Sequence, residues 1–275
     1  MPKTKILSKT GITLLIIGAL LLGYSFVEPY WIEEKVMVFI DRDVPSVFEN
    51  TKIVFMADVH CGPFLSNERA SKIVSRVNAL EPDLIILGGD YVQRDKKYIA
   101  PCFEELSRLE APLGVYGVTG NHDFWEDYDL TVASMEKAGI ILLDENSEWI
   151  EINGEKIKLG GVSDFWEGTP SVLSTIKDTD ENDFVLLVSH NPDFSELIRT
   201  KNIDLVLAGH THGGQATFFG LWAPFIPSLY GQKYRTGMVE LENTKVLVTN
   251  GVGAVTPPAR FFARPQINII YLRKE

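Results

Sequence analysis

Two stretches of the sequence share one pattern: Lys52-Ile-Val-Phe-Met-Ala-Asp-Val-His60 and Asp204-Leu-Val-Leu-Ala-Gly-His-Thr-His212. In each of them, a short apolar run ends in a cluster of aspartate and histidine. The pattern recurs in residues 83–90, 115–123 and 184–190. Continuous apolar runs of this length are typical of strands that are buried on both faces of a sheet.

Helix-like segments separate these runs, and the alternation predicts an α/β fold with mostly parallel strand pairing. Polar groups at the carboxyl ends of such strands meet at one edge of the sheet, which predicts a functional site there. We expect helices at residues 67–80, 98–110, 130–138 and 193–200. The tail is expected to add strands of a second sheet at residues 238–241, 246–249 and 267–272.

The composition excludes several classes of protein. A chain of 275 residues that is 45% hydrophobic can bury an ample core and is not disordered. The net charge of −11 argues against nucleic acid as a partner. Only two cysteines, Cys61 and Cys102, are present, which excludes a disulfide framework. One pairing stays open without support from the sequence, and we expect Cys61 to be a small packing residue.

The N-terminus is predicted to be a membrane anchor. Residues 10–27 carry no charge, and 18 residues at about 1.5 Å each span roughly 27 Å. We assign residues 1–32 to the anchor with a short linker and residues 33–275 to the catalytic domain. Lys3, Lys5 and Lys9 predict a cytoplasmic N-terminus, hence a single-pass protein of the cell membrane with an extracytoplasmic catalytic domain. A cleaved secretory signal is the alternative, although its cleavage site would be weak.

All five histidines fall in the strand-end clusters. Asp58 with His60, and His210 with His212, are spaced so that extended backbone would direct both side chains to one side. Asp90 could offer its two oxygens to two ions, and Asn121 a neutral oxygen. Nitrogen and oxygen ligands without thiolate suit Mn²⁺, Fe or Zn²⁺. Two such ions about 3.5–4 Å apart would clamp a phosphoryl group.

The ordered blocks resemble those of the calcineurin-like metallophosphoesterases. The blocks are Asp58-x-His60, Gly89-Asp90, Gly120-Asn-His-Asp123, His190 and Gly209-His-Thr-His212. The resemblance implies a β-sandwich of two mixed sheets flanked by helices, and two divalent ions, with manganese expected first and zinc or iron as alternatives. It implies that one ion is held by Asp58, His60, Asp90 and His212, and the other by Asp90, Asn121, His190 and His210. It also implies that His122 donates a proton to the leaving group or stabilises the phosphoryl oxygens, and that Asp123 orients the His122 imidazole.

Residues 209–215, 251–254 and 258–265 look like a bacterial membrane-associated branch of this superfamily. That branch includes phosphodiesterases and is related to the UDP-diacylglucosamine pyrophosphohydrolases of lipid A synthesis. Arg260, and less so Arg264, could pair with a substrate phosphate, since a guanidinium group matches phosphate geometry. The alternative is that one or both arginines make structural salt bridges in an acidic protein.

The sequence therefore predicts a membrane-anchored, dinuclear-metal phosphoesterase that hydrolyses a phosphodiester or pyrophosphate bond by metal-bound hydroxide. A lipid-linked or glycolipid substrate is favoured because the protein is anchored and because residues 218–230 form an unusually apolar loop. That loop would receive acyl chains, enter the bilayer or fold into the core. A UDP-diacylglucosamine-type substrate is a narrower hypothesis, because such precursors are made in the cytoplasm and the lysines place the domain outside.

Two other functions stay open. The first is a broad-specificity phosphatase that acts on phosphoproteins or nucleotides. The second is a non-catalytic metal-stabilised scaffold, which the presence of both His122 and Asp90 disfavours. Asp164 and Trp166 are expected near the rim of the site, without an assigned role.

Overall fold

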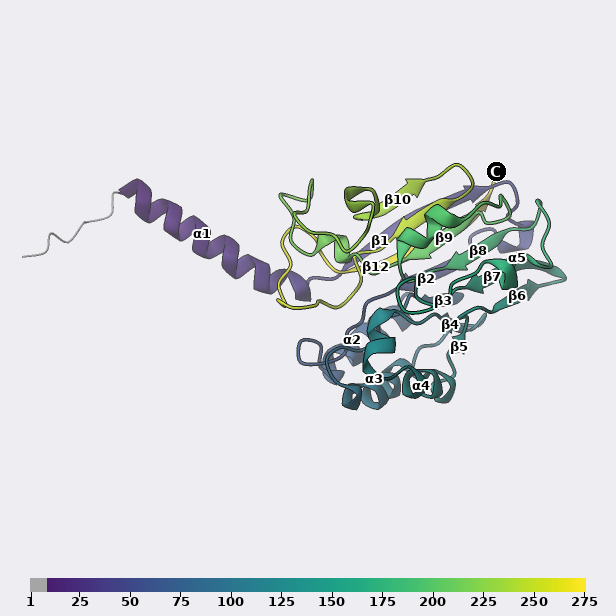
Figure 1. Cartoon of the computed structure of the whole chain (residues 1–275), viewed down its shortest axis with the longest axis horizontal. Coiled ribbons are helices and arrows are strands. Elements are labelled where there is room, and N and C mark those ends of the chain that lie inside the picture. The colour runs from purple at the N-terminus through teal and green to yellow at the C-terminus, as the bar shows by residue number, and fades with distance from the viewer. Residues whose placement is uncertain (1–8) are drawn as a thin grey trace, which may run out of the picture.

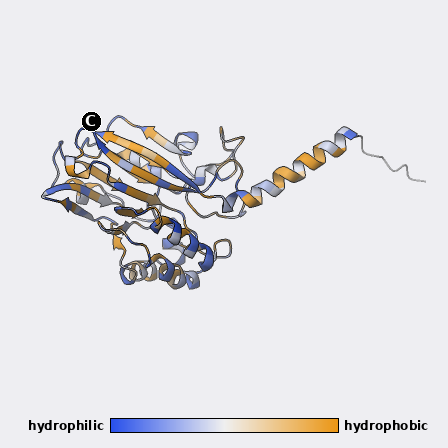
Figure 2. Cartoon of the chain, turned by 180° about the vertical axis from the view of Figure 1, so that it is seen from behind, coloured by the Kyte–Doolittle hydropathy of each residue, from blue (hydrophilic) through white to orange (hydrophobic). Residues whose placement is uncertain are grey.

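The computed structural model describes residues 9–275, in which one long helix projects from a two-layer β-sandwich (Figure 1). This helix, α1 (Lys9–Val27), is the one helix in the described part of the chain that is long and apolar enough to cross a membrane. Figure 2 shows that hydrophobic residues predominate along the length of this helix. Lys9 begins the helix, whereas Lys3 and Lys5 lie outside the described residues.

Two mixed six-stranded sheets form the sandwich. In spatial order, the first sheet contains β1 (Glu33–Asp41), β12 (Gln266–Lys274), β2 (Lys52–Met56), β3 (Leu84–Leu87), β4 (Val115–Gly117) and β5 (Ile141–Leu142). The second contains β10 (Gly237–Glu240), β11 (Lys245–Val248), β9 (Leu205–Ala208), β8 (Val185–Val188), β7 (Glu155–Gly161) and β6 (Ser147–Ile152). Most neighbouring strands are parallel, and three pairs are antiparallel, namely β12 with β2, β6 with β7, and β10 with β11. The predicted fold class is confirmed.

The tail strands divide between the sheets, so the prediction that all of them build the second sheet is wrong for β12. β12 lies between β1 and β2 of the first sheet. Its side chains are apolar toward both faces: Ile270 and Leu272 enter the core between the sheets, and Ile267 and Ile269 face the helices. A strand that is apolar on both faces suits the middle of a sheet better than its edge.

The central strands bury alternate residues in two different cores. From β2 and β3, Phe55 and Ile86 pack between the sheets against Leu186 and Leu207 of the second sheet. Their neighbours in sequence, such as Val54, face the opposite way into the core beneath the helices. This arrangement explains why these strands read as continuous apolar runs rather than as alternating ones.

Three helices cover the outer face of the first sheet: α2 (Asn67–Asn78), α3 (Ile99–Leu106) and α4 (Asn121–Lys137) (Figure 1). α4 begins at Asn121 rather than at the predicted residue 130, and a kink at Asp127 divides it. Its early start is stabilised by Asp123, whose carboxylate accepts the Gly120 N–H at 2.9 Å. The predicted helix at 193–200 is a short 3₁₀ helix, Pro192–Leu197, and α5 (Leu173–Ile176) is a single turn.

Cys61 and Cys102 form a disulfide, so the expectation of a simple packing residue at Cys61 is wrong. The two residues are 41 positions apart in the sequence, yet their Cα atoms lie 5.9 Å apart in the fold. The bond ties the chain just after His60 to α3. Only the packing of α3 on the first sheet brings these cysteines together, which is why the sequence offered no support for the pairing.

The end of α1 is docked on the domain, although a short linker is predicted there. The buried Glu28 carboxylate accepts the main-chain N–H groups of Phe262 and Ala263 at 2.7 and 2.6 Å. The Arg260 N–H donates to the Ser25 carbonyl at 2.9 Å. These bonds set the direction in which α1 leaves the domain.

Candidate active site

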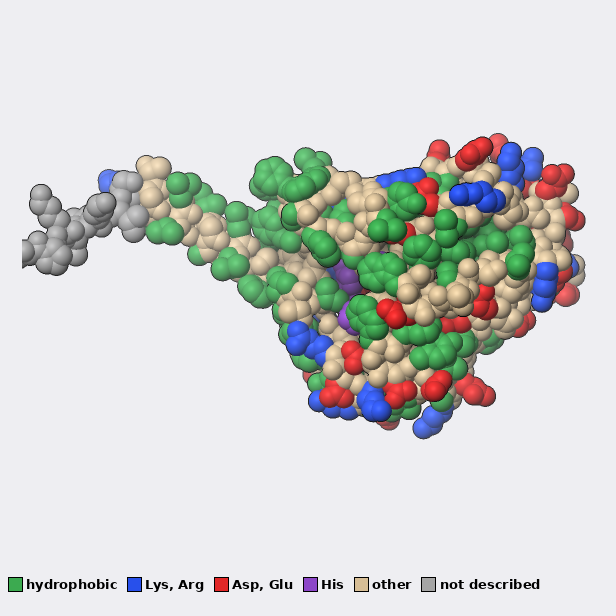
Figure 3. Space-filling model, viewed as in Figure 1, with side chains coloured by type: hydrophobic (Ala, Val, Ile, Leu, Met, Phe, Trp, Pro, Cys, Tyr) green, Lys and Arg blue, Asp and Glu red, His purple; other side chains and the backbone are tan. Residues whose placement is uncertain are grey.

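The predicted site residues meet at the carboxyl ends of strands from both sheets. Asp58 and His60 follow β2, Asp90 follows β3, and Asn121 and His122 begin α4 after β4. His190 follows β8, and His210 and His212 follow β9. In Figure 3 the histidines are visible in a hollow between hydrophobic side chains, on the side of the domain that carries α1.

Four side-chain atoms form a first cluster of candidate metal ligands. The Nε2 atoms of His60 and His212 lie 3.1 Å apart. Asp58 Oδ1 is 3.9 Å from His60 Nε2 and 3.4 Å from His212 Nε2, and Asp90 Oδ2 is 3.5 Å from His60 Nε2. These are the spacings of groups that surround a common centre.

A second cluster lies beside the first and shares Asp90 with it. Asp90 Oδ2 is 3.3 Å from His190 Nε2, which lies 3.2 Å from His210 Nδ1. The other ring nitrogen of His190 donates to the Gly88 carbonyl at 2.7 Å, so Nε2 is the ring atom that a metal ion would meet. Asn121 Oδ1 is buried, and within residues 9–275 it has no hydrogen-bond partner. One carboxylate oxygen thus borders both clusters.

The electrostatics of the site favour cations. Burial lowers the pKa of His60 and of His210 to about 3 each, so both imidazoles are neutral and can use a lone pair as a ligand. Burial raises the pKa of Asp58 to about 7. Buried carboxylates without a nearby positive charge are costly, and a divalent ion removes that cost. The donor set therefore fits metal ions.

The backbone at these positions is left-handed, not extended as the spacing of the Asp-x-His and His-x-His pairs suggests. Asp58, His60, Asp90, His210 and His212 all have φ angles between 50° and 66°. Non-glycine residues seldom adopt this conformation, and it persists where the surrounding structure enforces it. The paired side chains converge because each chain segment turns sharply beyond its strand.

One glycine allows the loops that carry Asp90 and Asn121 to touch. Gly89 has a φ of +86°, and a Cβ added there would lie 2.6 Å from the main-chain nitrogen of Gly120. No side chain fits at that distance. Gly89, just before Asp90, therefore serves close approach between two loops.

Asp123 occupies a place different from the predicted one. Its buried carboxylate accepts the main-chain N–H groups of Asp90, Tyr91 and Gly120 at 2.8, 3.0 and 2.9 Å. His122 Nδ1, by contrast, is buried and meets no hydrogen-bond partner in the part of the chain that the structure describes. Asp123 thus holds the Asp90 loop and does not orient the His122 imidazole.

Arg260 also differs from the prediction, because it faces the interior and not the opening. Its guanidinium group is fully buried and donates to the carbonyls of Asn250, Gly253, Ala263 and His212 at distances from 2.6 to 3.2 Å. In this position it supports the chain that carries His212, and it cannot touch a substrate phosphate.

Arg264 lies outside the site as well. Its guanidinium group lies over the Trp31 ring, 4.6 Å from the centroid, and donates to the Trp31 carbonyl at 2.9 Å. It packs at the base of α1. It lies away from both clusters, and among residues 9–275 it has no salt-bridge partner, so neither predicted role fits its position.

Two indole rings border the candidate site, and the sequence indicates only one of them. The Trp166 ring lies 4.3 Å from the His210 ring, and the Trp125 ring 4.7 Å from the His122 ring. Trp125 Nε1 donates to the Glu167 carboxylate at 2.7 Å, which joins α4 to the loop after β7. Asp164 is buried at the base of that loop, where its Oδ1 accepts the Trp166 N–H. The sequence does not indicate Trp125, because its closeness to His122 depends on the early start of α4.

The family model for calcineurin-like phosphoesterases matches residues 51–214, the stretch that contains every strand-end cluster. The chain belongs to the calcineurin-like phosphoesterase family. This family uses a dinuclear site for divalent metal ions, and the enzyme is a metal-dependent phosphoric ester hydrolase.

Curated relatives cover almost the whole chain. Phosphodiesterase YaeI of Escherichia coli is 31% identical over 260 residues, which is 91% of this chain and 92% of that protein. A transmembrane protein with a metallophosphoesterase domain from Danio rerio is 28% identical over 94% of this chain and 62% of its own length. Among solved structures, the NAD nucleotidase NadN of Haemophilus influenzae has a TM-score of 0.51 at 17% identity, over 73% of this chain and 45% of that one. The last likeness shows a shared fold alone.

Proposed function

We propose that this phosphoesterase hydrolyses a phosphodiester or pyrophosphate bond in a lipid-linked or glycolipid substrate, at the surface of the membrane that α1 spans. One metal ion would be held by Asp58, His60, Asp90 and His212, and the other by Asp90, Asn121, His190 and His210. The observation that carries the metal assignment is the position of Asp90 Oδ2, 3.5 Å from a nitrogen of one cluster and 3.3 Å from a nitrogen of the other.

Two divalent ions, when bound, would polarise the phosphoryl oxygens and lower the pKa of water. The chain's own contribution is orientation and proton transfer. His122 borders the first cluster, with its ring 4.7 Å from the His60 ring, and its main-chain N–H donates to Asp90 Oδ1 at 2.9 Å. A histidine at this position can donate a proton to the leaving oxygen or a hydrogen bond to the phosphoryl group.

The lipid-linked substrate is supported by where the site opens. The hollow that shows the histidines lies on the α1 side of the domain, among hydrophobic side chains (Figure 3). The docked end of α1, held through Glu28, keeps that hollow at a constant orientation to the anchor. The phosphate group of a membrane lipid would approach the site from the surface of the membrane that holds the anchor.

An extracytoplasmic position of the domain is supported by two observations. The lysines before the apolar run favour a cytoplasmic N-terminus. The Cys61–Cys102 disulfide is of a kind that persists in oxidising compartments and is rare in the cytosol. On this side of the membrane an envelope phosphodiester is a better substrate than a cytoplasmic UDP-diacylglucosamine-type precursor.

The first test compares bis-p-nitrophenyl phosphate with p-nitrophenyl phosphate, using the full chain in detergent micelles after chelation and resupply of Mn²⁺. We expect metal-dependent turnover of the diester. An Asp90→Asn variant should lose both ions together, whereas Asp129→Asn, an exposed position on α4, should keep both. Preferred turnover of the monoester would favour the broad-specificity phosphatase. Two bound ions without turnover of either ester would contradict the proposal.

A further inference from the structure

The loop of residues 216–230 presents a large apolar surface to solvent. It contains no charged residue. Leu221 and Leu229 are each 79% exposed and Phe225 is 73% exposed, so the alternative that these side chains fold into the core is wrong. The other large exposed side chains of the loop are Phe218, Phe219, Trp222 and Tyr230. Contiguous exposed apolar patches of this kind mark a contact surface.

The loop is held in this shape by polar bonds on its inner side. The Asp193 carboxylate accepts the Ser228 hydroxyl at 2.5 Å and the Leu229 N–H at 2.7 Å. The Gln232 side chain accepts the Ala223 N–H and donates to the Ala223 carbonyl, at 3.2 and 2.7 Å. Because these bonds pin the backbone, the apolar side chains are presented outward by a defined structure.

The apolar loop is continuous with the root of α1. The Phe219 ring lies 5.1 Å from the Phe262 ring, which lies 5.5 Å from the Tyr24 ring of α1. Just beyond, Tyr30 and Trp31 are 69% and 57% exposed, where interfacial aromatic side chains of a membrane helix are found. Figure 3 shows the hydrophobic side chains of this region gathered around the end of the helix.

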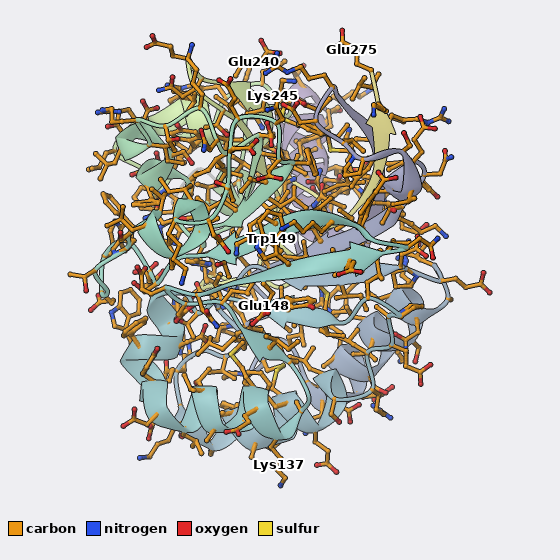
Figure 4. All side chains as sticks on the ribbon, turned by 90° about the vertical axis from the view of Figure 1, so that its right-hand side faces the viewer. Lys137, Glu148, Trp149, Glu240, Lys245 and Glu275 are labelled. Carbon is orange, nitrogen blue, oxygen red and sulfur yellow. A yellow bond between two sulfur atoms is a disulfide. The ribbon has the colours of Figure 1, made fainter. Side chains whose placement is uncertain are left out.

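The opposite end of the domain is polar. Figure 4 looks onto that end, where the labelled Glu148, Glu240 and Lys245 lie near the surface. In Figure 3 most acidic and basic side chains in view lie away from α1. The apolar loop therefore lies beside the anchor, whereas most of the charged side chains in view lie farther from it.

From this continuity with α1, we propose that residues 216–230 form a second membrane contact, which enters the interface of the bilayer that α1 spans. The inference rests on the proposed membrane anchoring. The loop begins four residues after His212 in the sequence, so its insertion would hold the opening of the metal site against the lipid surface. Amphipathic and aromatic segments bind membranes in this way through buried apolar area.

The test uses the full chain in phosphatidylcholine–phosphatidylglycerol vesicles, with a polarity-sensitive nitrobenzoxadiazole label on one introduced cysteine at a time. Leu221→Cys reports on the loop, Ile16→Cys on α1 and Glu240→Cys on the polar end. We expect lipids with a spin label in their acyl chains to quench the labels at 221 and 16 but not at 240. Native cysteines stay paired and unlabelled.

Two different results would overturn the inference, and they are distinguishable. If the label at 16 is quenched while that at 221 behaves like the one at 240, the loop is not in the membrane and the anchoring stands. If the label at 16 also escapes quenching, α1 does not span the bilayer and the anchoring fails first. Turnover of soluble bis-p-nitrophenyl phosphate in the same samples reports separately on the metal site.

A paired substitution gives an independent measurement. Leu221→Asp combined with Phe225→Asp should lower turnover of a phosphodiester embedded in vesicles by about tenfold or more, because charged side chains enter lipid poorly. Turnover of the soluble diester should stay within about twofold of the unsubstituted enzyme. Leu173→Asp, at a leucine that is 69% exposed elsewhere, is the matched control. Two outcomes would contradict the membrane contact. One is an equal loss of turnover on both substrates, and the other is a turnover of the vesicle-embedded substrate equal to that of Leu173→Asp.

Discussion

Replacing Asp123 by asparagine tests how the Asp90 loop is held. Asp123 Oδ2 accepts the N–H groups of Asp90 and Gly120, and Oδ1 accepts the N–H of Tyr91. Burial raises the pKa of Asp123, but all three neighbours are N–H donors, so the ionised form is the one that they stabilise. Asparagine keeps one acceptor oxygen and turns an amide NH₂ toward at least one of these donors.

The magnitude follows from the three bonds. In one of the three hydrogen bonds the acceptor is replaced by a donor that faces another donor, which lowers the free energy of unfolding by about 1.5–3 kcal/mol. The other two bonds change from charge-assisted to neutral, which lowers it by about 1 kcal/mol each. We therefore expect Asp123→Asn to lower the free energy of unfolding by about 4 kcal/mol in the metal-stripped protein. The Asp90 loop should also loosen, so that metal binding weakens at both clusters.

The assay combines thermal unfolding of the full chain in detergent micelles with the metal content per chain after dialysis. Asp129→Asn, an exposed carboxylate on the same helix, is the control and should change neither quantity. An Asp123→Asn protein that is as stable as the control, binds two ions and loses only kcat would refute the reasoning. Such a result would instead favour the orientation of His122 by Asp123.

Three further predictions concern other residues. His122→Ala should keep both metal ions and lose about 10²–10⁴-fold in kcat toward the diester, and a full rate with both ions bound would exclude its catalytic role. Trp166→Ala, which removes a ring 4.3 Å from His210, should raise KM about fivefold with little change in kcat, and steady-state kinetics with an unchanged KM would contradict a substrate contact. Burial, with Asp41 and Asp43 adding to it, raises the pKa of Asp204 to about 7. Because the folded state then holds its proton more tightly than the unfolded chain, stability should fall as pH rises from about 4 to 7. Melting temperatures measured over this pH range should depend less on pH in Asp204→Asn than in the unsubstituted protein. An unchanged pH dependence would show that other groups cause it.

Much of the candidate site could be predicted because its residues follow strands. The continuous apolar runs of β2, β3, β8 and β9 predict strands buried on both faces, and parallel strands bring their carboxyl ends to one edge. Asp58, Asp90, His190 and His210 follow such ends directly, so local pattern and topology together place them in one site. The apolar run of residues 10–27 likewise predicts α1 from composition and length.

Other features could not be predicted, since they depend on contacts between distant segments. Arg260 resembles a phosphate-binding residue in sequence, but four carbonyls from three chain segments enclose it. Cys61 and Cys102 pair only because α3 packs beside the turn that follows β2. Glu28 is predicted to belong to a linker. In the structure its buried carboxylate accepts two main-chain N–H groups of the 262–263 segment.

The fold class, the apolar helix and the identity of the polar groups at the strand ends follow from the amino-acid sequence, because strand periodicity and side-chain chemistry are local properties. The packing of distant segments sets how those groups are held: the left-handed turns at five of them, the Asp123 carboxylate behind Asp90, and the tryptophans at the rim. It also decided that the apolar loop of residues 216–230 lies exposed beside α1, since composition alone suits a core segment and a membrane contact equally well.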